Sequence, residues 1–119
     1  MTNPICRAAY LGFQNIAAIL LKHGADINIR SSDGRTPLMW AAFRNNAAMA
    51  AYLMDNGASI DMEDNDGWNA MDLSIIKMNY SVALLFKRRG LSSREKEMYE
   101  NHLWQKYDLD LFFKCLEED

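Results

Sequence analysis

The chain of 119 residues has few of the residues that build metal sites and disulfide frameworks, and it has no long apolar run. It has two cysteines, Cys6 and Cys115, and two histidines, His23 and His102, which form no CxxC motif and no Cys/His cluster. A structural zinc site or a disulfide framework needs such spacings, so we expect no metal site and two reduced thiols. No apolar run approaches the ~20 residues that cross a bilayer, and the amino terminus lacks the pattern of a signal peptide. The sequence therefore predicts an intracellular, cytoplasmic protein without membrane insertion.

Strong positive charge and catalytic motifs are missing as well. Lys plus Arg number 13 and Asp plus Glu 16, so the formal net charge is −3, which argues against a general nucleic-acid binder. The one basic run, 87–89, lies where a helix is expected to end, and cations are favoured there. Neither histidine accompanies a nucleophile in a motif, and no GxxxxGK or GxGxxG segment occurs. We expect no enzyme activity, no catalytic residue, no cofactor and no nucleic-acid partner.

A group of acids between residues 61 and 66 has the composition of a cation-binding loop but not its spacing. An EF-hand loop needs regularly alternating oxygen ligands and a glutamate at its twelfth position, and Met62 and Gly67 do not fit this pattern. We therefore interpret Asp61, Glu63, Asp64 and Asp66 as solvated turn acids that hold no metal.

The chain does contain an internal repeat. Gly24, Gly57 and Gly90 are evenly spaced along the sequence, and Pro4 and Pro37 are separated by the same interval. Apolar positions follow this interval too, which is the signature of a solenoid of stacked structural units.

The middle copy, 31–63, shows what one unit does. Gly34 permits a tight turn with positive φ, and Thr36 and Pro37 are typical of the cap and first position of a helix. A second apolar stripe that includes Leu53 has helical spacing, and Gly57 ends that helix as a left-handed cap. Each unit is thus predicted to be a turn, a short helix, a longer helix and an extended arm.

This pattern resembles the ankyrin repeat. The middle copy carries the resemblance in DGRTPLMWAA (33–42) and LMDNGASID (53–61). The flanking copies are NPICRAAYLGFQN (3–15), LLKHGADIN (20–28), DNDGWNAMDLSI (64–75) and VALLFKRRG (82–90). The resemblance implies an all-α solenoid of helix–turn–helix units with turn fingers over 1–91, divided at about 1–30, 31–63 and 64–91. In the family a histidine ties neighbouring turns together, and Met39 and Asp72 stand at that position here, so this tie is expected to be missing.

The segment 92–119 departs from the repeat. Ser92 and Glu95 form a capping-box pattern that predicts a helix. The residues after it are acidic and aromatic, with eight acids and four bases over 94–119. One interpretation is a helical cap that covers the last repeat. The other is an amphipathic segment that docks in a partner's groove.

The resemblance also implies a concave surface, made of turn tips and first helices, that binds protein partners. Trp68, at a turn tip, is the candidate hot spot, whereas Trp40 is predicted to lie in the core. The predicted partner-binding residues are Tyr10, Leu11, Arg30, Ser32, Asp33, Arg35, Phe43, Arg44, Glu63, Asn65, Asp66, Trp68, Ile76 and Lys77.

Three hypotheses for function remain open at this point. The first is a non-catalytic protein–protein interaction module, or scaffold, whose partner and oligomeric state are unknown. The second is a regulatory or substrate-recruiting fragment of a larger enzyme, such as an ankyrin-containing palmitoyltransferase. The third is a structural subunit of a large assembly that docks through its aromatic carboxyl-terminal helices.

Overall fold

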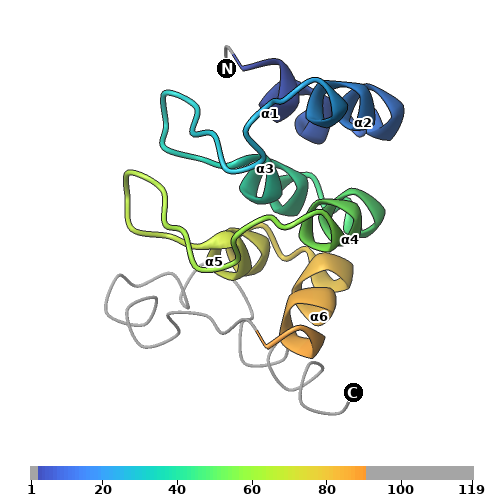
Figure 1. Ribbon diagram of the computed structural model, residues 1–119. Helices are drawn as coiled ribbons and strands as arrows, with labels where there is room; N and C mark the ends of the chain where they lie inside the picture. The colour runs from blue at the N-terminus through green and yellow to red at the C-terminus, as the bar shows by residue number, and fades with distance from the viewer. Residues whose placement is uncertain (1–2, 91–119) are drawn as a thin grey trace.

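A computed structural model describes residues 3–90, which form three pairs of antiparallel helices and no strand. The helices are α1 (Pro4–Leu11), α2 (Gln14–Lys22), α3 (Pro37–Phe43), α4 (Ala47–Asp55), α5 (Ala70–Ile76) and α6 (Tyr80–Arg88). Helix α3 packs against both α1 and α5, so these three helices form one layer, and α2, α4 and α6 form a second (Figure 1). The predicted all-α repeat fold is therefore confirmed. The expected cap or docking segment, 92–119, lies outside the described residues.

The short helices begin at the caps that the sequence predicts. The Thr36 side chain accepts a hydrogen bond from the Met39 backbone N–H at 3.3 Å, and Pro37 begins α3. In the third repeat, Asn69 and Asp72 form a reciprocal capping box, with bonds of 2.8 and 2.9 Å. Asp72 is fully buried. Where the family has its histidine, this chain therefore uses a carboxylate to start α5.

The turn inside each helix pair has a residue with positive φ, and the turn between α5 and α6 also ties the third repeat to the second. Gly12, Asn45 and Met78 occupy this turn at the same position of successive repeats, with φ of 80°, 55° and 56°. The Asn79 side-chain amide donates to the Ala42 carbonyl at 2.7 Å and to the Phe43 carbonyl at 3.1 Å. Both carbonyls lie at the carboxyl-terminal end of α3, where a helix leaves acceptors without intrahelical donors.

Two long loops, which we call the first finger (23–36) and the second finger (56–69), extend from the same side of the stack (Figure 1). The Ser31 N–H donates to the Arg35 carbonyl at 2.9 Å, and at the same position of the next repeat the Asp64 N–H donates to the Trp68 carbonyl at 2.8 Å. The two fingers therefore share one turn geometry.

Neighbouring fingers are joined without the family's histidine. The Arg30 guanidinium donates to the Glu63 carbonyl at 2.9 Å. Asn65 donates from its side chain to the Ser32 carbonyl at 3.0 Å and from its backbone to the Asp33 carbonyl at 3.1 Å. A Cβ at Gly34 would lie 2.8 Å from the Asn65 nitrogen, so only glycine permits this approach. The expected loss of the histidine tie is thus offset by other contacts.

The hydrophobic core runs between the two layers of helices and continues through all three repeats. Its fully buried side chains include Leu38, Met49, Leu53, Ile75 and Phe86. Small residues such as the alanines at 41 and 42 let the helices approach closely. Within residues 3–90, each helix is too short or too polar to cross a membrane.

The α1–α2 end of the stack keeps apolar side chains in solvent. Phe13, Ile16 and Ile19 are 50%, 48% and 57% exposed. At the position of Ile16 in the later repeats, Met49 and Val82 are 1% and 0% exposed. The difference arises because no described repeat packs on this end.

Candidate partner-binding surface

We use the term concave surface for the side of the molecule formed by α1, α3, α5 and the two fingers. At the helix side of this surface, aromatic rings and cations gather from all three repeats. This aromatic–cation cluster consists of Tyr10, Arg35, Trp40, Phe43, Arg44 and Lys77.

The rings of the cluster meet edge to face. The Tyr10 and Trp40 rings have centroids 5.6 Å apart at an angle of 83°, and the Trp40 and Phe43 rings are 6.0 Å apart at 70°. Such pairs are worth about 0.5–1.5 kcal/mol beyond the area they bury. Tyr10 and Phe43 come to the same cluster because they occupy the same position of the stacked helices α1 and α3.

Each ring of the cluster also makes a cation–π contact with an arginine or lysine side chain. The Arg35 guanidinium lies 5.1 Å from the Trp40 ring centroid and 5.2 Å from that of Phe43. Arg44 lies 4.8 Å from the Tyr10 ring, and the Lys77 ammonium lies 4.7 Å from the Phe43 ring. These interactions hold charged groups over rings at a gain of about 0.5–1 kcal/mol each where exposed.

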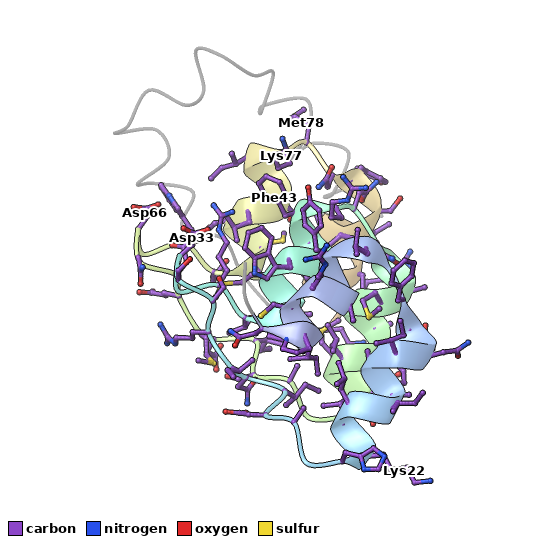
Figure 2. The ribbon with its side chains drawn as sticks, turned by 90° about the horizontal axis from the view of Figure 1, so that it is seen from above. Lys22, Asp33, Phe43, Asp66, Lys77 and Met78 are labelled. Carbon is purple, nitrogen blue, oxygen red and sulfur yellow. The ribbon has the colours of Figure 1, made fainter. Side chains whose placement is uncertain are left out.

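Helix ends contribute to this placement of charge. Arg44 and Lys77 are the carboxyl-terminal caps of α3 and α5, where the helix dipole favours cations. Figure 2 shows Phe43 and Lys77 near each other, and Asp33 and Asp66 together on the finger side. The concave surface is therefore basic near the helices and acidic at the finger tips.

Asp64 corrects the interpretation of the turn acids as solvated. Its carboxylate is only 1% exposed and accepts from the backbone N–H groups of Asp66 and Trp68, at 2.9 and 3.0 Å. It also lies 3.5 Å from the Arg35 Nε of the neighbouring finger. Burial of a carboxylate is unfavourable unless the charge is hydrogen-bonded and paired. Asp64 meets both conditions, because it closes its own turn and lies beside a cation. Asp61, Glu63 and Asp66 are exposed, as predicted, and no metal-ligating cluster occurs among residues 3–90.

The other predicted partner-binding residues fall into separate places. Trp68 and Ile76 are half-buried and pack against the hydrophobic core. Leu11 is 44% exposed and lines a shallow pocket with Phe13 and Ile16 instead of joining the cluster. The remaining predicted residues lie on the fingers, where they are exposed, namely Arg30, Ser32, Asp33, Glu63, Asn65 and Asp66.

Sequence reasoning missed Trp40 as a member of the cluster. The expectation that Trp40 lies in the core is confirmed, since its side chain is 7% exposed. Its ring also contacts the Arg35 guanidinium and the Tyr10 ring. Its place one helical turn before Phe43 puts both rings on one side of α3, and that signal was present in the sequence.

Cys6 is a buried thiol beneath the first finger and no candidate nucleophile. Its sulfur lies 3.8 Å from the Arg35 carbonyl and 3.9 Å from the Ile29 carbonyl. Burial raises the pKa of the Cys6 thiol from its usual 9.0 to about 11, against a smaller lowering by the Asn3 side chain. The reactive thiolate is therefore scarce at neutral pH.

Comparison with known proteins identifies the repeat. A family model for ankyrin repeats, in three copies, matches residues 5–93. The chain belongs to the ankyrin repeat family. Ankyrin repeats are in general a non-enzymatic type of protein-interaction module. A Mus musculus protein, fibronectin type 3 and ankyrin repeat domains 1 protein, is 46% identical over 44 residues. The match covers 36% of this chain and 13% of that protein.

Proposed function

We propose that this chain is a non-catalytic module that binds a protein partner on its concave surface. The observation that carries the proposal is the aromatic–cation cluster, which is assembled from side chains of all three repeats. A cluster that only stabilised one repeat would not need contributions from its neighbours.

The residue types of the cluster suit protein recognition. Tyrosine, tryptophan and arginine are enriched at the centres of interfaces, because they offer large rigid surfaces together with hydrogen-bonding groups. In this chain Arg44 and Lys77 are exposed and Tyr10 and Phe43 are half-buried, so a partner can contact all four. The rings are already held in place by one another, which reduces the entropy lost on binding.

The fingers supply the second half of the proposed interface. Their tips expose Asp33, Asn65 and Asp66, and hydrogen bonds between the fingers hold the tips side by side. A preorganised polar rim beside an aromatic centre is the usual anatomy of a protein interface.

Co-purification from cells can test this proposal with a matched pair of variants. The first variant, Phe43→Ala with Arg44→Ala, removes a ring and a cation of the cluster. The control, Ile19→Ala with Lys22→Ala, changes an apolar residue and a cation on α2, away from the concave surface (Figure 2). We expect proteins recovered with the wild-type chain to be recovered with the control and lost with the first variant. Circular dichroism establishes that both variants are folded, and retention of every partner by a folded first variant would contradict the proposal.

A further inference from the structure

Two cations of the aromatic–cation cluster, Arg44 and Lys77, face solvent, and no ion pair joins them to an acid among residues 3–90. The inner helices α1, α3 and α5 contain a single acid, Asp72, which is fully buried and occupied with capping its own helix. Among residues 3–90, the contacts of Arg44 and Lys77 are with the Tyr10 and Phe43 rings, not with a carboxylate. Two positive charges are thus held in fixed positions and remain available.

The aromatic–cation cluster also contains a hydrogen-bond donor without an acceptor among the described residues. The Trp40 indole N–H is buried and has no acceptor among the described residues. Its ring is in contact with Tyr10, Phe43 and Arg35, so the donor belongs to the cluster itself. A buried donor without an acceptor is unfavourable, and an oxygen ligand that entered the cluster would relieve this.

The opposite side of the concave surface limits which anion fits. Asp33 and Asp66 are exposed on neighbouring fingers (Figure 2), where the Asn65 N–H donates to the Asp33 carbonyl at 3.1 Å. A nucleic acid that reached the cluster would bring a row of phosphates near these carboxylates, and like charges repel. A protein segment can place a single carboxylate at the cations and neutral or basic residues at the tips.

Resting on the proposed function, we propose that the concave surface binds an acidic, extended segment of another protein. A glutamate or aspartate of that segment pairs with Arg44 and Lys77, and a neighbouring apolar side chain packs on Tyr10 and Phe43. Arginine suits this role because its planar guanidinium can bind a carboxylate through two parallel hydrogen bonds. The aromatic rings beneath both cations keep them desolvated on one side, which strengthens the ion pair.

A randomised ten-residue peptide library displayed on phage can test the inference with the full chain. Selections are run on the wild type, on Arg44→Gln with Lys77→Gln, and on Lys22→Gln as the control. Lys22 is an exposed lysine at the end of α2, far from Phe43 and Lys77 (Figure 2). We expect peptides enriched in Asp and Glu with the wild type and the control, and loss of that enrichment with the double variant.

The possible results separate the inference from the proposed function. Two results would overturn the inference and leave the proposed function standing. The first is that the selected peptides need Phe43 for binding but are not acidic. The second is that acidic peptides bind the Arg44→Gln, Lys77→Gln variant as well as they bind the wild type. Peptides that bind the Phe43→Ala, Arg44→Ala variant as well as the wild type would contradict both. Displacement of a selected peptide by a single-stranded oligonucleotide would also overturn the inference, since the site would then accept phosphates.

A charge exchange gives the sharpest measurement. Fluorescence anisotropy compares one selected peptide with the same peptide in which each acid is lysine. We expect the acidic peptide to bind Arg44→Glu with Lys77→Glu at least about tenfold more weakly than the wild type, because a hydrogen bond to a charged group contributes about 1.5–3 kcal/mol. The lysine peptide should bind that variant more tightly than it binds the wild type. The same affinity of both peptides for both proteins would overturn the inference.

Discussion

Arg35 of the first finger and Asp64 of the second finger are joined across the repeat boundary, with Nε and Oδ2 3.5 Å apart. The same guanidinium lies over the Trp40 and Phe43 rings. Arg35 therefore connects the acid that closes a finger turn to the aromatic–cation cluster on α3. Through this residue, the turn of the third repeat is joined to the aromatic–cation cluster of the second.

Removal of the Asp64 carboxylate should destabilise the second finger. In Asp64→Ala, the N–H groups of Asp66 and Trp68 lose their acceptor and Arg35 loses its buried acid. We expect the free energy of unfolding to fall by about 1–3 kcal/mol, measured by urea denaturation. Asp66→Ala in the same turn is the control, because the exposed Asp66 side chain should change stability by less than about 0.5 kcal/mol. Equal effects of the two substitutions would contradict this account of Asp64.

Met78 should be a site where glycine is more stable than the natural residue. Its φ is 56°, in the left-handed region that costs a residue with a Cβ roughly 1 kcal/mol or more, and its side chain is 37% exposed. We expect Met78→Gly to raise the free energy of unfolding by up to about 1 kcal/mol in urea denaturation.

Gly12→Ala provides the opposite result at the equivalent turn. The φ of Gly12 is 80°, and a Cβ there would lie 2.9 Å from the Asn46 side-chain nitrogen. We expect this substitution to destabilise the protein by at least about 1 kcal/mol. A stabilising Gly12→Ala, or a destabilising Met78→Gly, would show that this turn is not held in the left-handed conformation.

Equivalent positions in the first and second repeats should differ in their contribution to stability. Met49 is buried between repeats, whereas Ile16, its counterpart in the first repeat, is half in solvent. We expect Met49→Ala to lower the free energy of unfolding by about 2–5 kcal/mol, and Ile16→Ala by less than half as much. Thermal unfolding followed by circular dichroism makes the comparison. Similar losses at both positions would mean that the α1–α2 end is covered.

The buried Cys6 thiol should make stability depend on alkaline pH. Its pKa is about 11 in the folded chain against a usual 9.0, so the unfolded chain releases this proton first as the pH rises. The stabilisation that follows is complete below pH 9 and is lost as the pH rises to about 11. Its upper limit is about 2–3 kcal/mol. Wild-type stability should therefore fall further than that of Cys6→Ala between pH 8 and pH 11, and parallel pH profiles would contradict the assignment.

The regular repeat interval predicts most of the fold, because each unit repeats the same local chemistry. The cap at Thr36 and the left-handed glycines at 34 and 57 depend on neighbours within a few residues, and the structure has them where the sequence predicts. The stacking of α3 on α1 and α5 follows from the repeat itself.

Contacts between repeats were harder to predict from the sequence. Asp64 closes its own turn and meets Arg35 of the first finger, and nothing within that turn indicates the contact with Arg35. Arg30 and Glu63 occupy the same position of successive repeats and meet across the fingers, but through a backbone carbonyl and not through their opposite charges. Leu11 lines a pocket at the α1–α2 end with Phe13 and Ile16, a contact that its place in the repeat does not indicate. The partner itself depends on exposed side chains, which the fold does not constrain.

Hydrogen–deuterium exchange of the full chain, with and without a protein recovered in the co-purification, tests the central claim most directly. We expect partner binding to slow exchange in the fingers, around 32–35 and 65–68, and at the carboxyl-terminal ends of α1, α3 and α5. Exchange in the outer helices α2, α4 and α6 should change little. Protection confined to α2, α4 and α6, with the fingers unchanged, would contradict the assignment of the concave surface as the partner-binding surface.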